Sequence, residues 1–230
     1  MQRPSSRAPN LERQSVNRRT DAASLAEKSY QSLEERLVNL SLAPATLVSE
    51  GELIRLTGYG RTPVREAIQR LAQHDLFKVI PRKGLMVSPI SRAGLEQILE
   101  ARRPLERLIA HRAALQASDE QRSGLARIAR ELADSHDNFE RFVSHNRAIE
   151  KLLDQCCGNT YAIQAVTPLR IHCRRFWYFY RDRLKLSDAI AAHSNLVRLA
   201  ARRDMKGAQK ATDNIIQLLE RMVAGLEPSS

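Results

Sequence analysis

The sequence predicts a mainly α-helical protein made of two domains. Apolar residues recur at three- and four-residue steps through most of its 230 residues, whereas strand-like patterns are confined to about residues 76–88. Nine glycines and 5% aromatic residues argue against an all-β sandwich. Because 43% of the residues are hydrophobic, the chain can bury a sizeable core. We therefore expect one domain at residues 21–90 and an all-α domain at residues 91–230.

The first 20 residues carry five arginines and a single acidic residue, Glu12. A stretch this polar buries too little surface to offset the entropy lost on ordering, so we expect residues 1–20 to form a disordered basic tail. The whole chain has a formal net charge of +11, which favours a polyanion such as nucleic acid as a partner.

Composition also excludes several classes of protein. No apolar run approaches the roughly 18 residues that a membrane span needs, and the first residues lack the apolar stretch of a secretion signal. The three cysteines, Cys156, Cys157 and Cys173, are odd in number and have no CxxC spacing, which argues against a disulfide framework and a zinc knuckle. We expect a cytoplasmic protein with no membrane partner.

Local signals define three helices in the first domain. Apolar residues from Tyr30 to Leu40 repeat with a helical period, and residues 42–45, which include a proline, end the pattern. Ser49 can cap a second helix over residues 50–56. A third helix carries Pro63 in its first turn, where the missing N–H costs nothing.

Two short strand patterns follow the third helix, at residues 76–80 and 85–88, and enclose a basic turn at residues 81–84. Three short helices followed by a β-hairpin are the element order of a winged helix-turn-helix. The fold class that we expect is therefore a winged helix-turn-helix followed by an all-α helical bundle.

The third helix has the pattern of a DNA-reading helix. Arg61, Arg65 and Gln69 are spaced i, i+4, i+8 on one face, and Val64 and Ile68 lie on the opposite face. Such a helix can enter the major groove, where arginine pairs with guanine or holds a phosphate. An ordinary solvated charged face is the alternative, but the preceding helices and the basic hairpin favour double-stranded DNA as the partner. The candidate DNA-contacting residues are Arg61, Thr62, Arg65, Gln69, Arg82, Lys83 and Gly84.

The segment Tyr30–Val87 resembles the winged helix of the GntR family of bacterial transcription regulators. The run from Arg61 to Ala67 matches the recognition-helix signature of that family, and Pro81–Gly84 matches its wing. The resemblance implies a transcription regulator, more commonly a repressor, that binds a palindromic operator as a homodimer. Two positions depart from the family: Gly60 stands where Ser or Thr is usual, and Gly51 stands where Arg is usual.

Residues 91–226 show only helical signals. Apolar seams run through four segments, with expected breaks between helices at Gly158–Asn159 and Leu186–Ser187. The four seams lie at about residues 95–109, 139–153, 190–200 and 208–218. We expect a bundle of six or seven helices.

Four polar residues fall in or beside these seams and are the candidate effector-binding residues. Arg102, Asn146 and His193 each lie between apolar positions of a seam, and Glu150 follows Asn146 by one turn. Polar groups that point into a bundle are costly unless they are paired, so four of them predict an internal site. The guanidinium of Arg102 suits a carboxylate, and we expect a small organic acid as effector, with Glu150 as the counter-charge in its absence.

The bundle is also similar to the FadR-type ligand-binding domain called FCD, in residues 100–106, 146–159 and 193–208. Many members of that group hold a divalent metal with one Asp and three His. On this chain the four places fall at Asn146, Glu150, His193 and Ile215, and isoleucine cannot bind a metal. We therefore expect a degenerate site without a metal cofactor.

Two other functions remain as alternatives. One is an all-α enzyme with an appended nucleic-acid-binding module, in which Glu150 and His193 would exchange protons; the sequence shows no nucleophile–base spacing or phosphate-binding glycine loop to complete it. The other is a protein that coats DNA without sequence preference. The aromatic run at residues 176–180 fits core packing or a helix interface better than a pocket wall, with Phe176, Phe179 and Tyr180 on one side of a helix.

Overall fold

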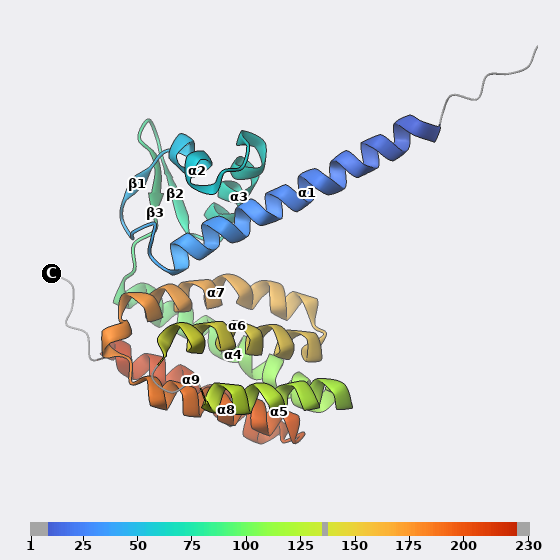
Figure 1. Ribbon diagram of the computed structural model, residues 1–230. Helices are drawn as coiled ribbons and strands as arrows, with labels where there is room; N and C mark the ends of the chain where they lie inside the picture. Colours follow the sequence, from blue (N-terminus) through green and yellow to red (C-terminus); the bar gives the residue numbers. More distant parts are fainter. Residues whose placement is uncertain (1–8, 135–137, 225–230) are drawn as a thin grey trace, which may run out of the picture. The chain divides into compact units, whose positions relative to one another are not determined.

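The computed structural model describes residues 9–134 and 138–224, and the side chains from Ser24 onward within these ranges (Figure 1). The chain divides into two compact units, one ending at Pro89 and the other beginning at Ile90. The elements of the first unit are α1 (Pro9–Val38), β1 (Leu47–Val48), α2 (Glu50–Thr57), α3 (Arg61–Gln73), β2 (Phe77–Ile80) and β3 (Gly84–Val87). Those of the second are α4 (Arg92–Gln116), α5 (Asp119–Ala133), α6 (Phe139–Cys157), α7 (Thr160–Phe179), the 3-10 turn η1 (Arg181–Arg183), α8 (Leu186–Ala201) and α9 (Met205–Ala224).

The first unit is a winged helix-turn-helix, which confirms the predicted fold class. Ser49 begins α2 with a capping box: its hydroxyl accepts from the Glu52 N–H, and the Glu52 carboxylate accepts from the Ser49 N–H. Gly58, in a left-handed conformation with φ of 72°, ends the same helix. Both ends of α2 are therefore defined by local sequence.

The sheet of this unit has three antiparallel strands in the order β1-β3-β2. The sequence predicted β2 and β3 but not β1, which is only two residues long and pairs Leu47 with Met86 and Val48 with Leu85. Gly84 begins β3 with φ of 103°, and a Cβ atom at this position would lie 3.0 Å from the Val48 carbonyl oxygen. The close approach of β1 therefore requires a glycine.

Residues 1–20, which the sequence predicts to be a disordered tail, are described only from Pro9 onward, where α1 begins. Helix α1 therefore includes residues 9–20, whereas residues 1–8 lie outside the described residues. After the proline in its first turn, α1 contains no further proline and no glycine. Because extending a formed helix costs far less than starting one, the polar first half can continue the packed second half.

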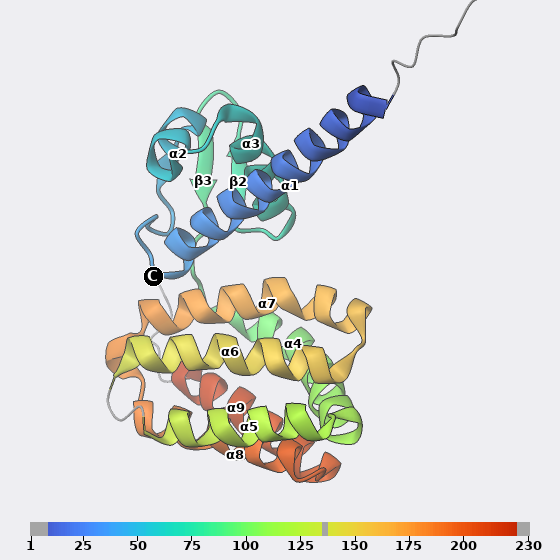
Figure 2. The same cartoon turned by 45° about the vertical axis from the view of Figure 1, so that its right-hand side comes forward.

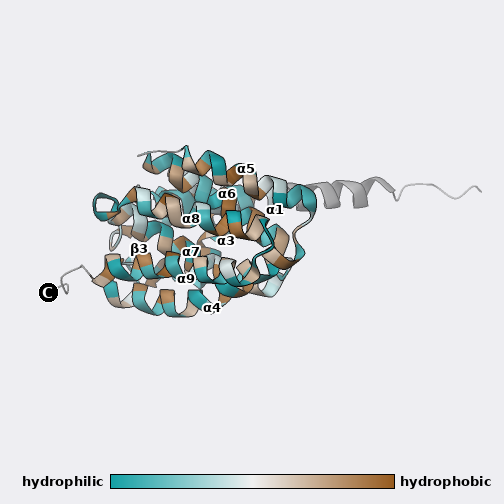
Figure 3. Cartoon of the chain, turned by 90° about the horizontal axis from the view of Figure 1, so that it is seen from below, coloured by the Kyte–Doolittle hydropathy of each residue, from teal (hydrophilic) through white to brown (hydrophobic). Residues whose placement is uncertain are grey.

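The second unit is an all-α bundle, which confirms the other half of the predicted fold class. Its described residues form six α-helices and one 3-10 turn. Helix α4 packs against α9, α7 and α6, and α5 packs against α8 (Figure 2). Brown apolar residues alternate with teal polar ones along these helices in Figure 3, as expected for amphipathic helices around one core.

Two local expectations in this bundle have different outcomes. Gly158, with φ of 62°, ends α6, and the Asn159 side chain caps α7, so the predicted break is confirmed. The break expected at Leu186–Ser187 lies earlier, because α7 ends at Phe179 and α8 already begins at Leu186. No glycine or proline occurs between these two helices to mark the position in the sequence.

The aromatic run also differs from its expected grouping. Phe176 and Trp177 are both buried, whereas Phe179 is 47% exposed. Successive residues of a helix differ by about 100°, and the buried face of α7 is wide enough to include both Phe176 and Trp177. The Trp177 ring stacks on Phe142 of α6 at a centroid distance of 4.7 Å. These two aromatic residues of the run are core residues.

Within the described residues, no helix is both long enough and apolar enough to span a membrane.

Candidate functional site

The exposed face of α3 carries four of the residues predicted to contact DNA. Arg61, Thr62, Arg65 and Gln69 are all exposed, while the opposite face is buried. The buried residues of this helix are Val64, Ala67, Ile68 and Leu71. Packing of these apolar residues fixes the rotation of α3, so the polar face must point outward.

Glu50 of α2 links the two arginines of this face. Its carboxylate accepts a hydrogen bond from Arg65 Nε at 2.9 Å and lies 3.7 Å from Arg61 Nε. Both arginine side chains remain more than 60% exposed, at 78% for Arg61 and 63% for Arg65. Because the bond uses Nε, the terminal nitrogens of Arg65 remain available to other acceptors. Glu50 was not predicted from the sequence, because its only local signal is its place in the acidic first turn of α2.

The hairpin tip carries the other predicted DNA contacts. Arg82 and Lys83 are exposed in the turn between β2 and β3, as is Gly84 at the start of β3, and Arg82 has a positive φ of 62°. The presence of glycine at position 84 is explained without DNA, because this residue closely approaches the backbone of Val48.

Gly51 and Gly60, the two positions that depart from the usual residues of the recognition motif, both have room for a side chain. A Cβ at Gly51 would have Arg55 Nη1 as its nearest neighbour at 3.7 Å, and one at Gly60 would have Pro63 Cδ at 4.0 Å. Neither glycine has a positive φ. Packing does not require glycine at either position.

In the helical unit, the predicted polar residues do converge on one place. Arg102, Asn146, Glu150, His193 and Ile215 all line a single enclosed cavity of about 30 Å³. Its other lining residues are Glu106, Ile149, Leu153, Arg170, Leu196, Thr212 and Ile216. A space of this size holds about one or two water molecules.

Glu106 lies at the centre of the charges around this cavity. It accepts a hydrogen bond from Arg102 at 2.9 Å and two from Arg170 at 2.8 and 2.7 Å. Glu150, the counter-charge that the sequence suggested for Arg102, does lie near it at 3.7 Å, but Glu106 is the closer partner and accepts its hydrogen bond. Glu106 is one turn from Arg102 on α4, so the two side chains reach each other within a single helix.

Two further ion pairs extend this network from α6 to α7. Glu150 accepts from Arg174 at 2.6 Å, and both carboxylate oxygens of Asp154 accept from Arg170 at 2.8 and 2.9 Å. Arg170 and Arg174 are buried. Neither these two arginines nor Glu106 was predicted from the sequence. The i, i+4 spacing of Arg102 and Glu106 is a usable local signal, whereas the contacts of Arg170 and Arg174 depend on packing between helices.

The charges of this network shift the pKa values of its acids. Burial alone would raise the pKa of Glu106, but Arg170 and Arg102 outweigh burial and lower it to about 2. For Asp154, burial outweighs the single partner Arg170, and its pKa is raised. Glu106 is therefore firmly ionised at neutral pH.

His193 is buried and neutral. Burial is the main cause that lowers its pKa to about 4, with a further contribution from the charge of Arg102. Its Nδ1 lies 2.8 Å from the Ala189 carbonyl oxygen. A carbonyl can only accept, so Nδ1 carries the proton and Nε2 is left as an acceptor.

These residues do not fit a divalent metal. Asn146 offers only a weak amide ligand, Ile215 offers none, and the Glu150 carboxylate is engaged by Arg174 with the guanidinium of Arg102 close by. No three His, Cys, Asp or Glu residues are grouped to hold a metal ion in the described parts of the chain. The guanidinium groups of Arg102 and Arg170 balance the carboxylates of Glu106 and Glu150 in the cavity lining, so the lining offers no excess negative charge to hold a divalent cation.

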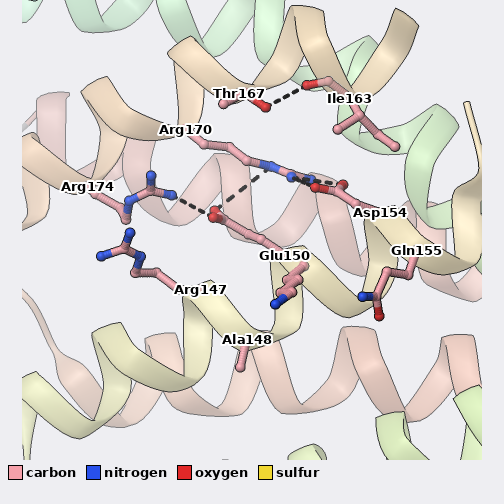
Figure 4. Close-up of a pocket in the computed structure, with 10 residues that line it drawn as sticks. Arg147, Ala148, Glu150, Asp154, Gln155, Ile163, Thr167, Arg170 and Arg174 are labelled. Carbon is pink, nitrogen blue, oxygen red and sulfur yellow. Dashed lines mark hydrogen bonds and ion pairs between the residues drawn. The ribbon is translucent and has the colours of Figure 1, made fainter. Parts of the chain in front are cut away.

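A second hollow lies on the outer side of this charge network. It is an open groove of about 620 Å³ between α6 and α7, and Figure 4 shows the ion pairs that cross it. It is lined by Arg147, Ala148, Glu150, Lys151, Asp154, Gln155, Ile163, Thr167, Arg170 and Arg174. Glu150 and Arg170 line both the groove and the enclosed cavity.

A winged helix-turn-helix with an arginine-bearing third helix, joined to a helical unit with an internal polar cavity, defines a DNA-binding transcription regulator with a separate effector domain. The family models agree in both halves. Residues 25–87 match the bacterial regulatory proteins of the gntR family, and residues 97–218 match the FCD domain. The chain belongs to the GntR family of transcription regulators and carries an FCD effector-binding domain. The alternative of an enzyme is thereby set aside, because the matched families and relatives are regulators.

Individual proteins show the same relationship. The HTH-type transcriptional repressor RspR of Escherichia coli is 26% identical over 204 residues, which cover 86% of this chain and 88% of that protein. An HTH-type transcriptional regulator of Agrobacterium vitis is 31% identical over 94 residues, or 41% of this chain and 55% of that protein.

Solved structures show a likeness of fold. McbR/YncC of Escherichia coli has a TM-score of 0.77 at 18% identity, covering 87% of this chain and 97% of that chain. A GntR regulator of Rhodococcus sp. RHA1 has a TM-score of 0.67 at 15% identity, covering 89% and 99%.

Proposed function

We propose that the chain is a cytoplasmic repressor that binds a palindromic operator as a homodimer and responds to an organic acid in its FCD domain. The observation that supports DNA binding is the exposed face of α3. This face presents Arg61, Thr62, Arg65 and Gln69, while the opposite face of the helix is buried. The word repressor in the name of the relative RspR supports the sign of regulation.

In the proposed complex, α3 lies in the major groove. Arg61 and Arg65 pair with bases or phosphates, and Thr62 and Gln69 add hydrogen bonds. The wing contacts the sugar-phosphate backbone of the DNA through Arg82, Lys83 and Gly84. Operators selected from random-sequence DNA should be inverted repeats. At fixed salt they should bind at least about 1,000-fold more tightly than random DNA, whereas a protein that only coats DNA would bind both alike.

The dimer follows from the limited reach of one helix. A single recognition helix reads about four or five base pairs, and two copies related by a two-fold axis double this number. Light scattering at micromolar concentration should give twice the chain mass of 26.1 kDa. A mass of one chain in the absence of DNA would contradict the proposal.

The effector is an anion held by Arg102, with Asn146, Glu150 and His193 around it. These side chains line one cavity, and the guanidinium of Arg102 gives it a permanent positive charge. At about 30 Å³ the cavity is too small for an organic acid, so the acid must bind a more open conformation of the bundle. A ligand that binds one conformation only shifts the equilibrium toward it, which is the physical basis of a response to the acid.

A panel of small mono- and dicarboxylates tests this proposal on the full chain. One member should raise the unfolding temperature of the protein and change its operator affinity. The variant Arg102→Gln should lose both responses, whereas Arg112→Gln, a control on the same helix, should keep them. Responses retained in Arg102→Gln would contradict the assigned anchor.

A further inference from the structure

The groove between α6 and α7 has an excess of positive charge. Arg147, Lys151, Arg170 and Arg174 line it, whereas the only acids in its lining are Glu150 and Asp154. Both acids are already bonded to arginines, Glu150 to Arg174 and Asp154 to Arg170. The lining therefore carries four cationic and two acidic side chains, a balance that favours an anion over a cation.

The arrangement of the cations suits a tetrahedral anion. Arg147 on α6 and Arg174 on α7 extend toward the same end of the groove from its two walls (Figure 4). Lys151 lies one turn after Arg147 on α6. A phosphate presents three terminal oxygens in different directions and can meet donors from both helices, whereas a carboxylate has two oxygens in one plane.

One of these donors is held in place before any ligand arrives. Arg174 is only 8% exposed, and its bond to Glu150 at 2.6 Å fixes its position in the wall of the groove. Binding then need not order a long flexible side chain, which reduces the entropic cost of capturing an anion. Arg147 and Lys151 are exposed and can close over the anion from the other side.

We propose that this groove is a second anion site, which binds the phosphate group of a small molecule through Arg147, Lys151 and Arg174. It is distinct from the carboxylate site proposed around Arg102, since that cavity is enclosed and holds about one or two waters. An anion in the groove competes with Glu150 for Arg174. Because Glu150 also lines the cavity, occupation of the groove alters the charge that the cavity presents.

Titration calorimetry on the full chain tests the site at fixed pH and ionic strength, with four probes: inorganic phosphate, glycerol 3-phosphate, sulfate and succinate. The phosphate probes should saturate with millimolar or lower dissociation constants, and succinate should bind at least about tenfold more weakly because its carboxylates cannot use all three donors. Tighter binding of glycerol 3-phosphate would identify an ester as the ligand, and equal binding would identify free phosphate.

Three variants separate a built site from general charge attraction. Arg147→Gln and Lys151→Gln should each weaken phosphate binding about tenfold, which corresponds to the loss of one charged hydrogen bond. Arg141→Gln removes the same charge from an exposed position of the same helix outside the groove lining, and should bind as the parent does. Absence of saturable binding, equal weakening by Arg141→Gln, or succinate binding as tightly as phosphate would overturn the proposal.

Discussion

Replacement of Glu106 by glutamine is expected to destabilise the helical unit strongly. In the structure this carboxylate accepts three hydrogen bonds from two buried arginines, Arg102 and Arg170. The amide in Glu106→Gln keeps one acceptor oxygen, loses the charge, and presents an NH₂ group to guanidinium donors. Both arginines then lose their shared counter-charge inside the bundle.

The size of the effect can be worked out from the same contacts. The pKa of Glu106 is lowered from an ordinary 4.5 to about 2, and this difference corresponds to about 3 kcal/mol of stability at neutral pH. Breaking a buried ion pair by removal of one partner typically costs about 3–5 kcal/mol, which agrees. Since the folded-state pKa is lowered, this stability is fully present above pH 4.5 and is lost as the pH falls toward 2.

Urea unfolding followed by tryptophan fluorescence measures the effect in the relevant unit, because the single tryptophan, Trp177, is buried in the bundle. The midpoint for Glu106→Gln should fall by about 1–2 M. Glu96→Gln is a matched control, because Arg92 and Glu96 form the same i, i+4 pair on α4 but at the surface, where such pairs contribute about 0.3–0.5 kcal/mol. Equal midpoints for the two variants would refute the reasoning.

Three further outcomes are expected. Burial lowers the pKa of His193 from 6.5 to about 4, so the folded unit resists protonation of this residue and its stability falls by about 2 kcal/mol between pH 6.5 and pH 5. The variant His193→Gln should lose this part of the pH dependence of urea unfolding. Gly84→Ala should increase hydrogen exchange in β3 more than Gly58→Ala, because both positions have positive φ but only the first brings a Cβ to 3.0 Å from Val48; equal effects would contradict the close approach. Glu50→Gln removes an acid beside Arg61 and Arg65, the arginines proposed to read DNA, so random-sequence DNA should bind several-fold more tightly and the ratio of operator to random affinity should fall; an unchanged ratio would show that this acid does not influence DNA reading.

Much of the first unit could be predicted because its signals are local. The Ser49 cap, the helical period of α3 and the turn residues around the wing each act within a few positions of the chain. Strand β1 was missed because two residues carry no period, and it forms only by pairing with β3 almost 40 residues later. The start of α1 at Pro9 was not predicted, because residues 9–20 have no apolar period to detect in the sequence.

For the polar cavity of the helical unit, the sequence predicted which residues come together but not their ion-pair partners. Arg102, Asn146, Glu150 and His193 were found because polar residues interrupt apolar seams, and they do line one cavity. Their partners were not found, since the contact of Glu106 with Arg170 joins residues 64 positions apart. The near neutrality of the network depends on which helices are neighbours, and a single sequence does not contain this information.

The most direct test of DNA reading by α3 is the operator affinity of Arg65→Ala, measured by fluorescence anisotropy at fixed salt on a selected operator. Loss of one arginine contact costs about 1–3 kcal/mol per half-site, so two half-sites should weaken binding about 30-fold or more. The control Arg70→Ala removes the same charge from α3, but its guanidinium is bonded to Glu27 and lies over Tyr30, so operator binding should be nearly retained. Parental operator affinity in folded Arg65→Ala would contradict the assignment of α3 as the recognition helix.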